Sequence, residues 1–298
     1  MTDSANVKFD FVDPFEYDQV IKELTSFFQG KGFIQAYAQN RRSIMAACED
    51  PTTMTTYNYS GVVWPLPQTN QMHLEVLLLE MSQKNARTNG LFCQTTSYRQ
   101  EPNPVPGRHN LIFPMFEFEA PGTFEDLLSM EGDLLRRLGY PQHAAQSSHR
   151  GISGYPELKY DTICELYSTG ELDHSHEQRL MDDNGHAAFI TNFPEHTDPF
   201  WNMARKDDRA QKVDVILSGI ETIGSAARSI DKDQMRKNFL TISDGKYSDK
   251  LFAEFGRDRV LNELDEFLDL NFIPRYGGGI GVTRLIRSLN LLRASDPM

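Results

Sequence analysis

The order of the predicted strands is the feature that most constrains the fold of this chain. One pair of strands, at 92–98 and 111–119, flanks a Pro-rich loop at 101–107, and a second pair occupies 213–218 and 219–225. No helix separates the strands within either pair, which is the pattern of antiparallel hairpins. This order disfavours the regular alternation of strand and helix in a Rossmann fold. It favours an α+β fold in which helices flank an antiparallel sheet of six to seven strands.

Helices are predicted between and after these hairpins from the spacing of apolar residues. The first, at 14–29, has Asp13 as its N-cap, Pro14 in its first turn and a glycine-rich stop at 30–32. Further elements are expected as helices at 70–84, 124–138, 231–239, 257–270 and 282–292, a partly helical stretch at 158–182 and a strand at 187–192. No repeat or low-complexity linker interrupts the chain, so we expect a single domain over residues 1–298.

Composition argues against several functional classes. The 298 residues are 39% apolar and 24% charged, and no run of about 18 apolar residues is present, so no membrane span is expected. The first residues lack a basic stretch followed by an apolar one, which argues against a secretory signal. Cys48, Cys93 and Cys164 are isolated and lack metal-ligand spacing, so we interpret them as reduced thiols of a cytoplasmic protein.

The net charge of −12 bears on the partners of the protein. A protein that wraps a polyanion needs Lys and Arg on its surface, because neutralised phosphates supply most of the affinity. The sequence contains no basic arm and no basic helix. A nucleic acid such as tRNA is therefore not expected as a partner, although a local basic patch is compatible with this whole-chain charge.

The first hairpin carries the first cluster of residues suited to chemistry. Arg99 and Glu101 stand at the end of its first strand, Arg108 and His109 at the end of the loop, and Phe113 in its second strand. Arginines at both ends of a loop can hold the inner and outer phosphates of a nucleoside triphosphate, each contact being worth roughly 1.5–3 kcal/mol. The Phe113 ring offers adenine a stacking surface. A surface hairpin with ordinary ion pairs explains these residues as well.

The second hairpin carries Asp214, Glu221 and Arg228 at a regular spacing of seven residues. Asp214 and Glu221 could share a Mg²⁺ ion, which prefers carboxylate oxygens together with substrate phosphates. Arg228 could hold a substrate carboxylate as a bidentate fork. Two strands with scattered charges are the alternative interpretation.

A glycine-rich run at 277–281 precedes Arg284 and the last predicted helix. Glycine lets the backbone approach a ligand closely, and a helix N-terminus favours negative charge. The run lacks the Gly-Lys-Ser/Thr of a P-loop, and no βαβ unit follows it. By itself it is weak evidence for a phosphate site.

Taken together and in this order, the three clusters resemble the class II aminoacyl-tRNA synthetases, and within them the aspartate/asparagine subgroup. The stretch 99–113 is similar to the second signature of that family, and the glycine run ending at Arg284 is similar to the third. The stretch 69–75 resembles Ser-Gly-Gln-Leu-x-x-Glu of asparaginyl-tRNA synthetases. The resemblance covers about residues 15–292, which is nearly the whole chain.

This resemblance implies a class II catalytic domain, ATP and Mg²⁺ as cofactors, a homodimer, and a role for each matching residue. Catalysis is implied for Arg99, Glu221 and Arg284, and metal binding for Asp214 and Glu221. The ATP-binding residues implied are Arg99, Glu101, Arg108, His109, Phe113, Asp214, Glu221 and Arg284. The substrate-binding residues implied are Glu49, Gln71, Glu75, Glu117, Ser225, Arg228 and Gly279.

Departures from the subgroup sharpen the expected function. The chain begins directly at the part that resembles the catalytic core, so we expect no anticodon-binding domain. It therefore looks like a stand-alone asparagine synthetase, of the archaeal type related to asparaginyl-tRNA synthetase or of the asparagine synthetase A type, whose glycine motif it matches at 277–285. Gln39 stands where the first signature normally ends in Pro, and Asp198 where a basic residue is common, which leaves the dimer contact and specificity open.

The expected reaction is the ATP-dependent formation of asparagine from aspartate and ammonia through an aspartyl-adenylate, with release of AMP and pyrophosphate. Another amine acceptor stays open, as does tRNA, which would make the chain a truncated asparaginyl- or aspartyl-tRNA synthetase. A non-catalytic regulatory paralogue is a further alternative, but the retained ATP-binding residues argue against it. The sequence does not identify the base that deprotonates ammonium, and Glu49 and Asp50 are weak candidates for it.

Overall fold

The computed structural model describes residues 12–39, 42–45, 50–84, 88–101, 104, 110–142 and 151–295. Its strands are β1 (Ile34–Gln35), β2 (Thr56–Tyr59), β3 (Val62–Pro65), β4 (Leu91–Tyr98), β5 (Ile112–Pro121), β6 (Glu157–Lys159), β7 (Ala187–Pro194), β8 (Arg205–Lys206), β9 (Arg209–Leu217), β10 (Ile220–Arg228) and β11 (Arg275–Gly281). Its α-helices are α1 (Pro14–Gly30), α2 (Gln71–Gln83), α3 (Phe124–Arg137), α4 (Tyr160–Tyr167), α5 (His174–Asn184), α6 (Lys232–Thr241), α7 (Lys246–Phe255), α8 (Arg257–Leu268) and α9 (Val282–Ser295).

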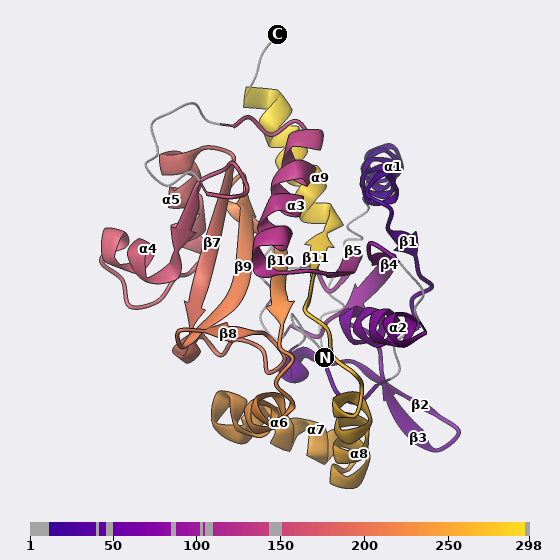
Figure 1. Cartoon of the computed structure of the whole chain (residues 1–298). Coiled ribbons are helices and arrows are strands. Elements are labelled where there is room, and N and C mark those ends of the chain that lie inside the picture. The colour runs from indigo at the N-terminus through magenta and orange to yellow at the C-terminus, as the bar shows by residue number, and fades with distance from the viewer. Residues whose placement is uncertain are drawn as a thin grey trace, which may run out of the picture.

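One broad sheet organises the fold, as Figure 1 shows. Its strand order is β1-β4-β5-β11-β10-β9-β7-β6, with β8 paired to β9, and only β1 with β4 and β6 with β7 run parallel. The predicted α+β class with a mostly antiparallel sheet is confirmed. In the described residues this sheet has nine strands instead of the expected six to seven. The extra strands β1, β6 and β8 have two or three residues each, too few to leave a periodic pattern in the sequence.

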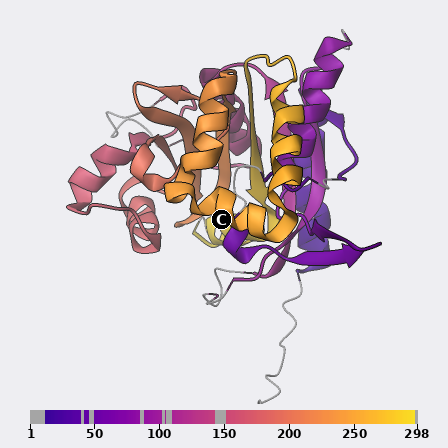
Figure 2. The ribbon, with the colours of Figure 1, turned by 90° about the horizontal axis from the view of Figure 1, so that it is seen from below.

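The two faces of the sheet pack against different helices. On one face, α1, α3 and α9 form a continuous apolar core that includes Leu24, Leu127 and Leu285, and Ala227 of β10 points into it. The next residue back, Ala226, belongs to a second cluster with α6, α7 and α8, because successive side chains of a strand point to opposite faces. Figure 2, seen from below, has these three helices in front of the sheet. Within the described part, no helix has the length and apolar character needed to cross a membrane.

Most of the predicted elements are confirmed, but several observed elements were not predicted. The N-cap of α1 is confirmed, since the carboxylate of Asp13 accepts hydrogen bonds from the first turn. The sequence pattern does not predict the hairpin of β2 and β3, strand β11 or helix α7. Strand β11 has four glycines among its seven residues, so it shows no alternation of apolar and polar side chains. The apolar pattern of α7, Tyr247, Leu251 and Phe255, spans only ten residues between two glycines, so its signal merges with that of α8.

A buried carboxyl group lies between α3 and the centre of the sheet. Glu131 of α3 is fully buried, and its Oε1 accepts a hydrogen bond of 2.6 Å from the hydroxyl of Ser225 on β10. Burial raises the pKa of Glu131 to about 8, an effect that the Ser225 bond opposes and the charges of Asp214 and Glu157 reinforce. At neutral pH this carboxyl is therefore mostly protonated.

We expect the substitution Glu131→Gln to abolish a pH dependence of stability. Folding raises this pKa, so the stabilising contribution is complete below about pH 4.5 and is lost as the pH rises through about 8. One unit of pKa change is worth about 1.4 kcal/mol. The free energy of unfolding of the variant should therefore exceed that of the parent by up to several kcal/mol at pH 9 and match it at pH 5. Urea unfolding at both pH values measures this, with the exposed Glu165→Gln as control. The same difference at both pH values would contradict the prediction.

Candidate active site

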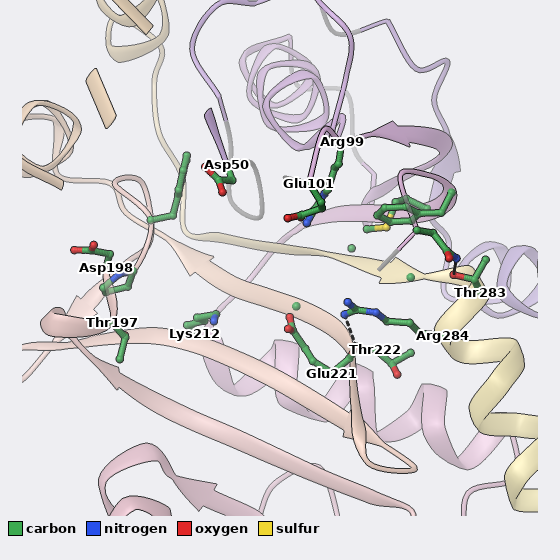
Figure 3. Close-up of a pocket in the computed structure, with 18 of the residues that line it drawn as sticks. Asp50, Arg99, Glu101, Thr197, Asp198, Lys212, Glu221, Thr222, Thr283 and Arg284 are labelled. Carbon is green, nitrogen blue, oxygen red and sulfur yellow. Dashed lines mark hydrogen bonds between the residues drawn. The ribbon is translucent and has the colours of Figure 1, made fainter. Parts of the chain in front are cut away.

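A cavity of about 390 Å³ opens on the face of the sheet opposite α3 and α9. Strands β5, β10 and β11 form its floor, and the end of β4, the start of α9 and the segment 197–203 form its walls (Figure 3). This volume falls within the range of small-molecule sites. Six predicted site residues line it: Arg99, Glu101, Phe113, Glu221, Gly279 and Arg284.

Arg99 and Phe113 face each other across the first hairpin. The register of β4 and β5 pairs Ser97 with Phe113, and the backbone N–H of Arg99 donates to the carbonyl of Leu111 at 2.8 Å. The guanidinium carbon of Arg99 consequently lies 5.6 Å from the centroid of the Phe113 ring. A cation and an aromatic ring therefore stand side by side on one wall, which suits a phosphate and a stacked base.

Arg284 and Glu221 meet on the other side of the cavity. Arg284 lies in the first turn of α9, and its Nη1 donates to the backbone carbonyl of Glu221 at 2.7 Å, as Figure 3 shows. The floor beside them is bare backbone at Gly279, and the terminal methyl group of Met115 lies 2.8 Å from where a Cβ would stand. Helix α9 begins at Val282, directly after β11, and a helix N-terminus favours negative charge.

Asp214 approaches Glu221 from the neighbouring strand but lies to one side of the cavity. It lines an adjoining pocket, and its Oδ2 is 2.7 Å from Nζ of Lys212. Burial raises the pKa of Asp214 to about 7, with Lys212 opposing and Glu221 reinforcing the shift. Among the described residues, no three His, Cys, Asp or Glu side chains have a metal-binding arrangement. Two carboxylates suffice for a Mg²⁺ ion that also binds substrate phosphates, so the donor chemistry of this pair fits that ion.

A ring of four charged side chains lies beside the cavity, on the same face of the sheet. Glu75 of α2, Glu119 of β5, Arg228 of β10 and Arg275 of β11 have no exposed side-chain surface. Nη2 of Arg275 lies 2.6 Å from Glu75, and Nη2 of Arg228 lies 3.2 Å from Glu119. The cross pairs are 3.6 Å and 3.8 Å apart, so the ring is closed. Each charge is thus compensated without solvent.

Two further predicted residues are attached to this ring. Gln71 accepts a hydrogen bond from Arg228, and its Nε2 donates to the carbonyl of Gly278 at 2.7 Å. Glu117 accepts hydrogen bonds of 2.9 Å from the backbone N–H of Asn70, directly before α2. Both residues therefore fix α2 against the sheet. The charge of Glu117 also adds to burial in raising the pKa of the Cys93 thiol.

The structure thus separates the predicted site residues into groups. Gln71, Glu75, Glu117 and Arg228 lie beside the cavity and are almost completely buried. Ser225 is a correction: its side chain points to the opposite face of the sheet, where it bonds Glu131, so the prediction that this side chain contacts substrate is wrong. Its neighbours Thr222 and Gly224 line the cavity in its place, because alternate strand positions share a face. The predictions for Glu49, Arg108 and His109 lie outside the described residues.

Several residues of the site are not predicted by the sequence analysis. Among them, Lys212 lines the cavity, Thr222 lies on its floor, and Glu119 and Arg275 complete the buried ring. The strand period offers a signal for Lys212, which stands two residues before Asp214 and therefore shares its face. Arg275 directly precedes the glycine run, but nothing in its spacing distinguishes it from a surface arginine.

The chain is similar to known synthetases over most of its length. The model of a family described as tRNA synthetases class II (D, K and N) matches residues 17–293. The chain is also 22% identical, over 293 residues, to the aspartate–tRNA(Asp) ligase of Pyrobaculum aerophilum, a match that covers 91% of this chain and 62% of that protein. It therefore spans less than two thirds of the length of this curated relative.

Solved structures share the fold. Asparaginyl-tRNA synthetase from Pyrococcus horikoshii complexed with asparaginyl-adenylate matches with a TM-score of 0.72 and 18% identity, over 93% of this chain and 65% of that one. The Entamoeba histolytica asparaginyl-tRNA synthetase in complex with asparaginyl-adenylate matches with a TM-score of 0.69 and 18% identity, over 92% of this chain and 63% of that one. A putative aspartyl-tRNA synthetase from Leishmania major matches with a TM-score of 0.69 and 15% identity, over 93% of this chain and 62% of that one. At these identities the comparisons establish the architecture alone.

We expect Arg275→Met to be strongly destabilising. The substitution leaves two buried carboxylates, Glu75 and Glu119, with one guanidinium, and breaking a buried ion pair costs about 3–5 kcal/mol. The matched control is Arg209→Met, which breaks an ion pair with Asp161 that is about half exposed and should cost about 0–1 kcal/mol. Urea unfolding at pH 7.5 compares the two, and an equal loss in both variants would refute the structural role of the ring.

Proposed function

The chain belongs to the tRNA synthetases of class II (D, K and N), and from that premise we propose that it is an ATP-dependent aspartate–ammonia ligase. In the proposed reaction a carboxylate oxygen of aspartate attacks the α-phosphorus of ATP, and pyrophosphate leaves. Ammonia then attacks the acyl carbon of the aspartyl-adenylate, AMP leaves, and the surplus proton passes to a base. The products are asparagine, AMP and pyrophosphate.

The convergence of Arg99, Phe113, Glu221 and Arg284 on one cavity is the observation that carries the adenylation step. The ring of Phe113 supports a stacked adenine, Arg99 beside it reaches the α-phosphate, and Arg284 receives the outer phosphates. These groups act by positioning and by stabilising negative charge. Mg²⁺, held at the carboxylate of Glu221 in the cavity, would supply further charge neutralisation when bound.

Gln71 and Arg228 are the proposed anchors for the α-carboxylate and amino group of aspartate. Arg228 is engaged by Glu119, so a substrate carboxylate has to replace that partner. Burial raises the pKa of Glu119 to about 7, against the opposing charge of Arg228. Glu119 can therefore leave the guanidinium by taking up a proton near neutral pH.

An acidic side of the cavity favours ammonia over tRNA as the acceptor. Asp50 and Asp198 line the cavity on the side away from Arg284 (Figure 3). Carboxylates attract an ammonium ion and can accept its proton, whereas they repel the phosphates of a nucleic acid. The net charge of −12 acts in the same direction. Both observations thus argue against tRNA as the acceptor.

The proposal is tested by incubating the purified chain with ATP, Mg²⁺ and L-aspartate, with and without ammonium chloride. We expect AMP to form only with ammonium, in an amount equal to the asparagine measured by chromatography. Arg99→Ala and Arg284→Ala should each lower this rate at least about 100-fold, because each removes a charge aimed at the phosphates. The exposed Lys206→Ala serves as a charge control and should stay within about twofold.

Other outcomes would identify other functions. AMP formation only with tRNA would identify an aminoacyl-tRNA ligase, which is what the Pyrobaculum relative is. Aspartate-dependent pyrophosphate exchange without formation of asparagine would support the adenylation step. It would contradict ammonia as the acceptor and indicate another amine. Absence of turnover and exchange with every amino acid would indicate a regulatory paralogue.

Arg228 gives the proposed reaction a pH dependence. Ionised Glu119 competes with the substrate carboxylate for Arg228, and it ionises as the pH rises through about 7. We expect the KM for aspartate to rise about tenfold from pH 6 to pH 8, in line with the growing ionised fraction. In Glu119→Gln, which has no ionised form, the KM should stay flat over this range. A parallel rise in both proteins would contradict the competition.

A further inference from the structure

Lys212 occupies the boundary between the nucleotide cavity and the adjoining pocket that Asp214 lines. It stands two residues before Asp214 on β9, so both side chains rise from the same face of the strand. Its Nζ is 2.7 Å from Oδ2 of Asp214 and 4.1 Å from the centroid of the Phe193 ring. The lysine side chain is only 24% exposed. A carboxylate and an aromatic face therefore hold the ammonium in place.

The neighbouring strand leaves room for this arrangement. The register of β9 and β10 places Ala226 opposite Lys212 and Gly224 opposite Asp214. Directly opposed residues share a face, so two small residues stand where larger side chains would push the lysine aside. The register shifts between Glu221 and Ile223, and the Glu221 side chain points into the cavity towards the amino group of Lys212 (Figure 3).

Asp214 is poorly placed to bind a metal ion while this ion pair is intact. Oδ2 of Asp214 is bonded to the ammonium of Lys212, and its Oδ1 is buried and makes no hydrogen bond to the described residues. A metal ion that bridged Asp214 and Glu221 would therefore have to share the Asp214 carboxylate with that ammonium. Two like charges on one carboxylate repel each other, so Mg²⁺ and Lys212 compete for Asp214. Glu221 lines the cavity, and no ion pair of its carboxylate is found among the described residues.

We propose that Lys212 is a built-in cation of the nucleotide site, which contacts the phosphates directly, and that Asp214 positions this lysine while Glu221 alone provides the protein carboxylate for Mg²⁺. The inference rests on the proposed function, since it requires a nucleotide in the cavity. Lysine binds phosphate as a compact point charge and needs no fixed orientation. Arg99 and Arg284 flank the same cavity, so three protein cations surround the phosphates. Asp214 is accordingly a positioning residue.

The test measures metal and nucleotide binding without turnover. Purified full-length protein is titrated with Mn²⁺ in the presence of α,β-methylene-ATP, and bound Mn²⁺ is followed by electron paramagnetic resonance. We expect Glu221→Gln to weaken Mn²⁺ binding at least tenfold and Asp214→Asn to change it less than threefold. Calorimetry with the analogue and Mg²⁺ should show about tenfold weaker nucleotide binding for Lys212→Met, partial recovery for Lys212→Arg, and no change for the exposed Lys206→Met.

The outcomes separate this inference from the function it rests on. If Asp214→Asn weakens Mn²⁺ binding as much as Glu221→Gln, Asp214 is a metal ligand and the inference is overturned. If Lys212→Met binds the analogue within twofold of the parent, the lysine does not contact phosphate and the inference is likewise overturned. In both cases nucleotide binding by the parent protein keeps the proposed function intact. A parent protein that binds no analogue overturns both. Circular dichroism of each variant establishes that it is folded.

Discussion

The buried ring of Glu75, Glu119, Arg228 and Arg275 is the interaction on which the rest of the site depends. It ties α2, β5, β10 and β11 together at a point with no solvent, where each charge is tolerable only because its partners are in place. Helix α2 has a largely apolar surface and no side-chain cap of its own. Ion pairs and the Glu117 bond to its first turn therefore fix its position more specifically than apolar packing can. The cavity keeps its shape because these four elements cannot shift independently.

The buried ring can form only because β11 has glycine beside it. A Cβ on Gly277 would lie 1.7 Å from Oε2 of Glu119, a distance that no rearrangement of the ring could accommodate cheaply. The bare strand leaves room for Glu119 on its neighbour β5, and two positions further on it leaves the cavity floor open at Gly279. One run of glycines thus serves two purposes on the same face of β11: it leaves room for a buried carboxylate at Gly277 and for a ligand at Gly279.

The sequence predicted the class of fold and much of the cavity, because both follow from local pattern. Hairpins show as adjacent strand signals, and Arg99, Phe113 and Arg284 stand at the ends of elements that the pattern places well. Burial was harder to predict. The face of Ser225 depends on a register shift in β10 at Glu221, which a single sequence does not reveal. Arg275 pairs with Glu75, 200 residues away along the chain, and such a pairing arises only from the tertiary fold.

The cavity floor carries the groups that suit adenylation, and loops in its walls carry the acidic residues near the acceptor. This separation explains how one architecture can serve several acceptors. The groups that suit adenylation are on the floor strands or directly at their ends, where the ring and the glycines hold them. Asp50 and Asp198 lie on loops outside these strands. Asp50 caps the start of one short 3₁₀ helix, and Asp198 ends a second 3₁₀ helix with a left-handed backbone at φ 49°. Substitutions at such loop positions change the charge that an incoming nucleophile meets without disturbing the strands. Acceptor choice can therefore vary within this fold while adenylation is kept, and the acidic side of this cavity is where such a choice would be made.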